Sequence, residues 1–395
     1  MCFLKRTWLQ VDCDALEENY CSIRNIVNKK SKIMCVLKAD AYGHGAGFVS
    51  KLYQRLGADW LAVSNIEEAI QIRKNKVVLP ILILGYTHYD MVNQLSLYSI
   101  TQTVISLDYA KKLSQQALKF GFSVDVHIKL DTGMNRIGLV YQDFVEDSKT
   151  IEQVQEICSL KNLNIKGIYT HFSSSDEEEN CKDYTLWQFN NFKNAIKILK
   201  EKNIRFELKH CSNSGAILTR PFMNMDMVRA GIVLYGILPN SNIKTNVKLK
   251  PAMQWKTIVS QIKNVRKNSA ISYNRTFYTS KNSKIAIVPT GYADGYPRIF
   301  SGKAKMIING RKVPIIGRIC MDQLVLDISE VQNVENNNIV TIFGKDGKST
   351  ITLDELASLS NTINYELLCI ISKRVTRVFM KKNKILETFN YIRQF

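Results

Sequence analysis

Short apolar runs alternate with amphipathic segments from about residue 30 to residue 235. Eight of these runs have the length and composition of buried β-strands: Ile33–Leu37, Trp60–Ser64, Ile81–Leu84, Thr101–Ile105, Val124–Leu130, Ile165–His171, Phe206–Cys211 and Met227–Arg229. Apolar residues at three- to four-residue spacing predict helices at Glu67–Lys74, Tyr109–Phe120, Phe144–Leu160 and Tyr184–Lys202, and another helix through Leu16, Tyr20, Ile23 and Val27. Eight β–α units over this length favour an α/β TIM-type (β/α)8 barrel over an open sheet.

The pattern changes after Pro239, where strand-like segments predominate: Met253–Val265, Ile285–Val288, Ala304–Ile308, Val313–Ile316, Leu324–Ile328, Ile339–Phe343 and Arg374–Phe379. Asn309-Gly310 is typical of a two-residue hairpin turn. One helix is predicted at Thr352–Leu359, with acidic residues in its first turn. We therefore expect a barrel domain over residues 1–240 and a mostly β domain over 241–395, with the residues up to about Gln10 pairing with the second domain.

Composition narrows the class of protein. A chain of 395 residues can bury two cores, and 45% apolar with 23% charged residues is ordinary for a soluble protein. The N-terminus lacks the apolar stretch of a secretory signal and the longest apolar runs are too short for a bilayer, so we expect a cytoplasmic protein without membrane contact. The nine cysteines are scattered without a Cys-x-x-Cys pair, which argues against a disulfide framework and against a metal site.

The formal net charge of +19 raises the question of a nucleic-acid partner. The lysines are spread along the chain, however, and no dense basic block or aromatic–glycine RNA-binding pattern is present. We therefore expect no nucleic-acid partner, although positive charge favours anionic ligands in general.

The first candidate for chemistry is Lys38, which follows the apolar run Ile33–Leu37 and opens the string Lys-Ala-Asp-Ala-Tyr-Gly-His-Gly. A lysine that loses hydration at the end of a buried strand can lose its proton and form a Schiff base. Taken alone, the same residue also fits a surface lysine after an edge strand.

Other polar clusters follow the later strands, at the end of a barrel where active sites lie. They are Leu130–Gly138, Thr170-His171-Phe172, His210–Gly215 and Arg229–Ile232. Ser214 stands where a helix begins, and the missing side chain of Gly231 lets backbone N–H groups approach a ligand. Both features suit a phosphate bound after strands seven and eight. Each residue has a structural alternative, such as a helix cap for Ser214, but their shared position indicates a site.

These motifs resemble those of alanine racemases, and the resemblance covers essentially the whole chain. Further matching motifs are Ser272-Tyr273-Asn-Arg-Thr-Phe277, Gly291-Tyr292-Ala-Asp294-Gly295, Gly317-Arg-Ile-Cys-Met321-Asp322-Gln323 and Tyr365-Glu366. The resemblance implies a barrel followed by a β domain, the cofactor pyridoxal 5'-phosphate (PLP), and a homodimer in which the β domain of each subunit completes the active site of the other.

The resemblance also implies roles in cofactor binding. Lys38 would carry PLP covalently and His171 would stack on its pyridine ring. Arg229 would face the ring nitrogen, with His210 behind it. The phosphate would be held by Tyr42, Ser214, Gly231, Ile232 and Tyr365, and Asn213 would be a further cofactor-binding residue.

Other implied roles concern the substrate. Arg136 would bind its carboxylate and the phenolic oxygen of PLP, with Lys129, a candidate for carbamylation, orienting that arginine. The backbone of Met321 from the partner subunit would also meet the carboxylate, supported by Asp322. An access corridor would be formed by Tyr292, Asp176, Arg298 and Arg318. No metal is implied.

Racemisation removes a proton from one face of Cα and returns one to the other face, which requires two opposed bases. Lys38 and Tyr273 from the other subunit would supply them, while PLP acts as the electron sink. The product would be D-alanine for peptidoglycan.

Alternatives to this interpretation differ in what the β domain contributes. A basic-amino-acid decarboxylase of the same architecture carries a Cys-Asp-Ser type motif, where this chain has Cys320-Met321-Asp322-Gln323. A non-catalytic PLP-binding homeostasis protein is a barrel alone and lacks Tyr273. A serine or broad-specificity racemase stays open, because a pocket rejects one added hydroxyl only weakly.

Overall fold

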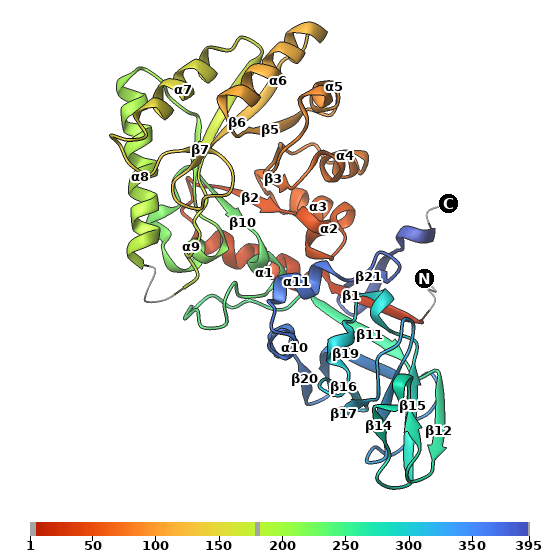
Figure 1. The fold of residues 1–395 in the computed structure, drawn as a ribbon. Helices are drawn as coiled ribbons and strands as arrows, with labels where there is room; N and C mark the ends of the chain where they lie inside the picture. Colours follow the sequence, from red (N-terminus) through yellow and green to blue (C-terminus); the bar gives the residue numbers. More distant parts are fainter. Residues whose placement is uncertain (1–4, 178–181, 394–395) are drawn as a thin grey trace. The chain divides into compact units, whose positions relative to one another are not determined.

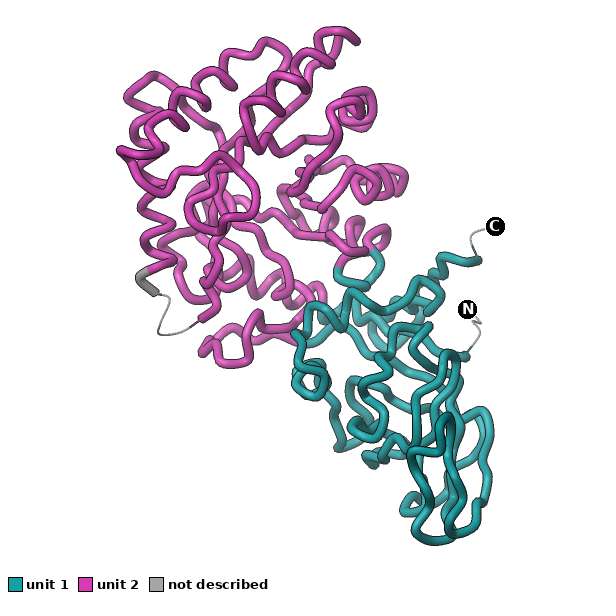
Figure 2. Tube along the Cα trace, viewed as in Figure 1, with its two compact units in different colours: residues 1–15, 42–45, 251–395 teal, residues 16–41, 46–250 magenta. Residues whose placement is uncertain are grey.

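The computed structural model describes residues 5–177 and 182–393. The chain forms two compact units (Figure 2). Unit 2 comprises Leu16–Ala41 and Ala46–Lys250. Unit 1 comprises the described residues up to Ala15, the short segment Tyr42–Gly45, and the chain from Pro251 onward. The predicted ranges 1–240 and 241–395 stay a proposal about how the chain divides into domains.

Unit 2 contains eight parallel strands in its described part, in the order β10-β2-β3-β4-β5-β6-β8-β9 (Figure 1). Their bounds are β2 Lys32–Val36, β3 Trp60–Val63, β4 Ile81–Ile83, β5 Ile100–Val104, β6 Val124–Asp131, β8 Leu163–Tyr169, β9 Leu208–His210 and β10 Met227–Ala230. The short β7 (Leu139–Val140) pairs with β6. Between β10 and the residues that follow β9, the Arg229 N–H donates to the Ser212 carbonyl at 3.0 Å, so the sheet is a nearly closed barrel. The predicted TIM-type fold is confirmed.

Helices surround these strands (Figure 1). They are α1 Cys13–Ile26, α3 Ala46–Arg55, α4 Ile66–Lys74, α5 Val92–Leu97, α6 Leu107–Phe120, α7 Ser148–Ser159, α8 Lys182–Glu201 and α9 Ser214–Thr219, with 3-10 turns η1 Tyr89–Met91, η2 Pro221–Met223 and η3 Ile232–Tyr235. In α6, Ser106 caps the first turn, one apolar stripe is buried, and Gly121 ends the helix with φ +71°. The helix thus follows from its capping residues and its periodicity.

Two predicted elements are wrong in extent. The helix predicted at Phe144–Leu160 begins only at Ser148, because Asp143 and Asp147 accept nearby backbone N–H groups and hold the preceding residues in turns. The run Met253–Val265 is two strands, β11 (Met253–Ile258) and β12 (Gln261–Val265). They separate because β11 pairs with β1 and β19, whereas β12 pairs with β15.

Unit 1 is mostly β. One sheet runs β12-β15-β18-β17-β16-β19-β11-β1-β21-β22, with β20 on β19, and β13 pairs with β14 as a separate hairpin. The bounds not yet given are β1 Thr7–Asp12, β13 Ala270–Ile271, β14 Phe277–Tyr278, β15 Ser283–Val288, β16 Lys305–Ile308, β17 Arg311–Ile316, β18 Leu324–Asp327, β19 Ile339–Asp346, β20 Ser349–Ile351, β21 Thr376–Lys381 and β22 Lys384–Phe389. The hairpin at Asn309-Gly310 is confirmed, since Ile308 pairs with Arg311.

Short helical elements complete unit 1. α10 (Leu353–Ser360) begins after its cap Thr352, which confirms the predicted helix, and α11 (Asn364–Cys369) follows it. The 3-10 turns are η4 Tyr273–Arg275, η5 Tyr292–Asp294, η6 Arg298–Phe300 and η7 Tyr391–Arg393. None of the helices in the two described ranges has the length and apolarity needed to cross a membrane.

Candidate active site

Lys38 is the first residue of α2 (Lys38–Tyr42), which is separated from β2 by Leu37 alone. This turn is left-handed: Ala39, Asp40, Ala41 and Tyr42 have φ values of 52°, 57°, 55° and 52°. Left-handed helical backbone costs an L-residue about 1–2 kcal/mol, and this turn contains no glycine before Gly43. The surrounding structure must therefore impose the conformation that follows Lys38.

Glu68 is one residue that imposes it. One carboxylate oxygen accepts the Ala39 N–H at 2.6 Å and the other accepts the Ser64 N–H at 2.7 Å. Asp40 in turn accepts the Ala46 N–H at 2.8 Å. Glu68 thus joins the ends of β2 and β3. Sequence reasoning missed this residue, whose only signal was an acidic side chain in the first turn after an apolar run.

Arg229, at the end of β10, is the centre of a buried polar network. Its Nη1 lies 2.8 Å from His210 Nδ1, and its Nη2 lies 3.0 Å from His171 Nδ1. Nη2 also donates to the carbonyls of Thr170 and Cys211. The predicted neighbours Arg229, His171 and His210 are therefore in contact.

The network fixes the protons of its histidines. Arginine only donates, so Nδ1 of both His171 and His210 must accept and both rings carry their proton on Nε2. His210 Nε2 then donates to His127 Nδ1 at 2.9 Å. Burial first, and the Arg229 cation second, lower the pKa of His127 to about 3 and that of His210 well below its usual value. These two imidazoles are neutral at physiological pH.

Four cations act on His171. The poor solvation of its ring is the largest cause of its lowered pKa, followed by the charges of Arg229, Lys129, Arg136 and Lys38. His171 and all four of these cations were singled out from the sequence. The five residues thus lie near one another, at the carboxyl ends of the barrel strands. Such a concentration of positive charge suits an anionic ligand.

Lys129 lies inside the barrel on β6. Its Nζ donates to the Leu130 carbonyl at 2.9 Å and lies 5.4 Å from the centre of the Tyr169 ring. Burial first and Arg229 next lower the pKa of Lys129 to about 7. Lys129 therefore gives up its proton more easily than an ordinary lysine, and its neutral amine is the nucleophilic form.

Asp131 organises the loop that carries Arg136. Its Oδ1 accepts the N–H groups of Gly133, Met134 and Asn135 at 2.9–3.0 Å, and Oδ2 accepts that of Arg136 at 2.9 Å. Burial by itself raises the pKa of Asp131, but these backbone donors lower it overall. The sequence motif contained Asp131, but its role as the acceptor for this loop was missed.

The residues predicted to hold a phosphate fall into two groups. In unit 2 the Gly231 N–H donates to Ser214 Oγ at 3.0 Å, and Ile232 follows at the start of η3. Asn213 caps α9 and accepts the Ser175 hydroxyl at 2.6 Å. In unit 1 the rings of Tyr42 and Tyr365 lie 6.0 Å apart.

Tyr273 and Met321 lie together in unit 1. They line one shallow hollow of 530 Å³ with Ser272, Cys320, Asp322 and Gln323. The side chains are 67% exposed for Tyr273 and 54% for Met321. The Met321 backbone N–H finds no acceptor within the part of the chain that the structure describes. Both are therefore available to a ligand or to another chain.

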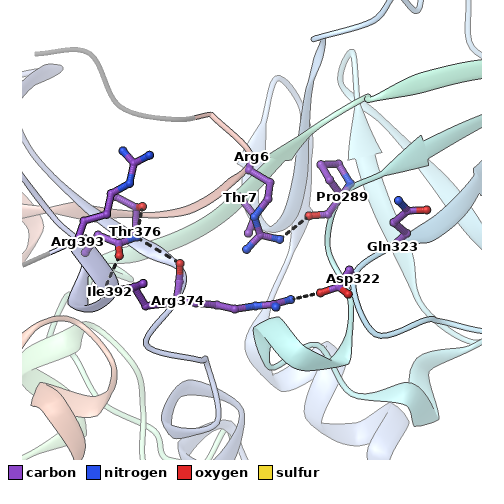
Figure 3. A pocket seen from close by; sticks show the side chains of 10 residues that line it. Arg6, Thr7, Pro289, Asp322, Gln323, Arg374, Thr376, Ile392 and Arg393 are labelled. Carbon is purple, nitrogen blue, oxygen red and sulfur yellow. Dashed lines mark hydrogen bonds and ion pairs between the residues drawn. The ribbon is translucent and has the colours of Figure 1, made fainter.

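A second pocket shares Asp322 and Gln323 with this hollow (Figure 3). Here Arg374 donates to Asp322 at 2.6 Å and Arg6 donates to the Pro289 carbonyl. Both arginines also bind the fully buried Asp294, which accepts the Gly291 N–H as well. Asp294 thus connects the loop that holds Tyr292 to the loop that holds Asp322.

The proposed corridor residues are spread over both units. Tyr292, Arg298 and Arg318 belong to unit 1, and the Tyr292 N–H donates to the Cys320 carbonyl at 3.1 Å. Asp176 belongs to unit 2, where it packs against Gly215. Their joint role stays a prediction. Across residues 5–177 and 182–393, no cluster of histidine, cysteine and acidic residues could hold a metal ion.

Comparison with known proteins gives these residues a family context. The family model "Alanine racemase, N-terminal domain" matches residues 11–239, and "Alanine racemase, C-terminal domain" matches residues 252–379. The chain belongs to the alanine racemase family. Relatives in this family are named as racemases, and the chain is accordingly a racemase enzyme.

Individual alanine racemases match along nearly their whole length. The alanine racemase of Clostridium perfringens (strain SM101 / Type A) is 43% identical over 390 residues, which is 98% of this chain and 99% of the relative. The solved alanine racemase of Clostridium difficile 630 has a TM-score of 0.94 at 38% identity, covering 99% of this chain and 100% of that one. A histidine racemase from Leuconostoc mesenteroides subsp. sake also matches, with a TM-score of 0.86 at 26% identity over 96% of this chain and 99% of that one.

Proposed function

We propose that this protein interconverts L- and D-alanine with PLP as cofactor. The observation that carries the proposal is the cluster of Lys38, Lys129, Arg136 and Arg229 around His171. Relatives over the full chain are named alanine racemase, and a solved relative from Bacillus anthracis, 33% identical with a TM-score of 0.93 over 100% of both chains, holds bound L-Ala-P. The histidine racemase is more distant, and its substrate is not favoured here.

The residues present fit PLP, an anionic cofactor with an aldehyde, a ring nitrogen and a phosphate. Lys38 supplies the amine that would hold the aldehyde carbon. Arg229 keeps N–H groups on Nε and Nη1 for which the described residues provide no acceptor, and these suit a ring nitrogen. The Ser214 hydroxyl accepts the Gly231 N–H and so has its own proton to donate to a phosphate, which the hydroxyls of Tyr42 and Tyr365 also suit.

PLP would withdraw electrons from Cα of the bound amino acid. Lys38 Nζ would take the proton from, or return it to, one face of Cα, and Tyr273 of the partner subunit would do so on the opposite face. Arg136 and the backbone N–H of Met321 of the partner subunit would bind the substrate carboxylate and keep Cα between the two bases. Arg229, whose guanidinium stays charged, would donate to the ring nitrogen, and this would disfavour a proton on that nitrogen and so limit side reactions.

Two further parts of the proposal concern assembly and modification. The exposed Tyr273 and Met321 support a homodimer in which each subunit completes the other's site. The nucleophilic amine of Lys129 would attack CO2, forming an N–C bond and releasing a proton, and the resulting carbamate would orient Arg136. We further propose that the enzyme is cytoplasmic and supplies D-alanine for peptidoglycan.

The test is the racemisation rate of alanine, serine, lysine and histidine, measured with purified protein and PLP. We expect alanine to have the highest kcat/KM. A serine racemase is the second candidate, because discrimination against one added hydroxyl is commonly only about 10²-fold in such pockets. A higher kcat/KM for serine, or for lysine, would replace alanine in this proposal.

A further inference from the structure

The backbone on both sides of Tyr273 is strained. Ser272 has φ 65° and ψ −169°, a region that is essentially restricted to glycine. Asn274 and Arg275 follow with φ values of 59° and 48°. Asparagine tolerates positive φ, but serine in this region does not. Such a conformation persists only where neighbouring structure holds it in place.

The two ends of this loop are fixed by apolar packing. Ile271 in β13 pairs with Phe277 in β14. Ile271 is buried in a cluster with Ile285 and Ile316, against which Phe277 also packs. The loop from Ser272 to Thr276 is therefore short, closed and anchored, and it presents Tyr273 at its tip.

The Ser272 side chain supplies the remaining contact. Its hydroxyl donates to the Arg318 carbonyl at 2.6 Å and lies 3.3 Å from the Cys320 thiol. Gly317, with φ +67°, allows this approach, because a Cβ there would lie 3.0 Å from Ser272 Cβ and 2.6 Å from the Ile271 carbonyl oxygen. The hydroxyl thus ties the Tyr273 loop to the chain segment that leads to Met321.

We propose that Ser272 is a positioning residue for Tyr273. Its bond to the Arg318 carbonyl holds the backbone in the strained conformation, and that conformation sets the position of the Tyr273 ring relative to Met321. This inference rests on the proposed function only in taking Tyr273 as one of the two bases.

The first test separates strain from ordinary packing by comparing two variants in the full-length, PLP-loaded protein. Ser272→Ala loses the hydroxyl but keeps the strained Cβ, whereas Ser272→Gly loses both. We expect the glycine variant to unfold about 2 °C above the alanine variant. Thermal unfolding followed by circular dichroism measures this order.

Ser260 offers a matched control, because its hydroxyl also donates to a backbone carbonyl, that of Ile287 at 3.0 Å, and its φ is not positive. There the order should reverse, since glycine gives the unfolded chain more conformational freedom than alanine and relieves no strain where φ is not positive. A glycine variant less stable than the alanine variant at Ser272 as well would overturn the strain argument.

The second test concerns chemistry. In D2O, we expect both Ser272 variants to lower the ratio of α-hydrogen exchange from L-alanine to exchange from D-alanine by about 10- to 100-fold. The reason is that a displaced Tyr273 acts poorly on the face of Cα that it serves. Tyr273→Phe provides the reference for this ratio. If Tyr273→Phe changes the ratio and the Ser272 variants do not, the positioning role is wrong. If Tyr273→Phe leaves the ratio unchanged, the two-base proposal itself fails.

Discussion

Lys38 and Tyr273, the two proposed bases, both adjoin strained backbone but are held by different means. The left-handed turn after Lys38 is fixed by carboxylates, since Glu68 and Asp40 both accept backbone N–H groups there. The loop of Tyr273 is fixed by the apolar cluster of Ile271, Ile285 and Ile316 and by one hydroxyl, and its tip is exposed. Lys38, whose proposed chemistry needs a surrounding with little water and several charges, is held by contacts within its own unit. The exposed Tyr273 can instead serve the active site of a second chain.

Removing Lys38 should have the largest effect. Lys38→Ala removes both a base and the anchor of PLP, so we expect kcat to fall by about 10⁴-fold or more, together with loss of the visible absorption band of the bound cofactor. Racemisation assays and absorption spectra measure both. Lys32→Ala, at the start of the preceding strand β2, is the control, because Lys32 is half-exposed and outside the proposed site. A PLP linkage still reducible by borohydride in the Lys38 variant would refute the assignment.

Tyr273→Phe should have the next largest effect. It should reduce α-hydrogen exchange from L-alanine by about 10²- to 10⁴-fold and affect D-alanine less, because only one face of Cα loses its base. Tyr278→Phe is a matched control, since this tyrosine is 53% exposed on the neighbouring β14.

Mixing the two inactive variants sharpens the comparison between the bases. If each site takes Lys38 from one subunit and Tyr273 from the other, random mixed dimers of Lys38→Ala and Tyr273→Phe should regain about a quarter of the wild-type activity. Equal exchange from both enantiomers in Tyr273→Phe, or no regain on mixing, would count against the shared site.

Asp131→Asn should have the smallest effect. It tests how much the carboxylate of Asp131 stabilises the loop that carries Arg136. The neutral amide accepts the loop's N–H groups less well, so we expect a loss of about 1–3 kcal/mol in unfolding free energy and a higher KM through Arg136. The control is Asp125→Asn, at the far end of the same strand, where the carboxylate accepts one exposed side-chain N–H.

The pH dependence distinguishes a charge effect from a packing effect. The folded pKa of Asp131 lies below its unfolded value of 3.8, so its stabilisation is complete above that pH and is lost as the pH falls through the folded pKa. Urea unfolding of wild type and Asp131→Asn should therefore show a difference at pH 7 that shrinks below about pH 4. A difference that stays constant with pH would exclude the charge as its cause.

The sequence predicted the barrel well because its strands are buried apolar runs flanked by capped helices, as in α6 with Ser106 and Gly121. The prediction of one strand over Met253–Val265 was wrong, because its two halves pair with different strands and no local sequence pattern shows this. Motif resemblance located Lys38, His171, Arg229 and Tyr273. The supporting roles of Glu68, Asp131 and Ser272 were missed, because these side chains accept or donate hydrogen bonds at backbone groups, including some far along the chain.

The sequence by itself determined the order and type of most elements, since hydrophobic periodicity is local, and the chemical identity of the proposed site residues. Only the tertiary structure decided which of them touch: that Arg229 bonds to both His171 and His210, that Asp131 gathers four backbone donors, and that Ser272 is bound to Arg318. It also revealed the left-handed turn after Lys38. Strain of that kind is invisible in a sequence without glycine there, because it is maintained by contacts between residues that are distant along the chain.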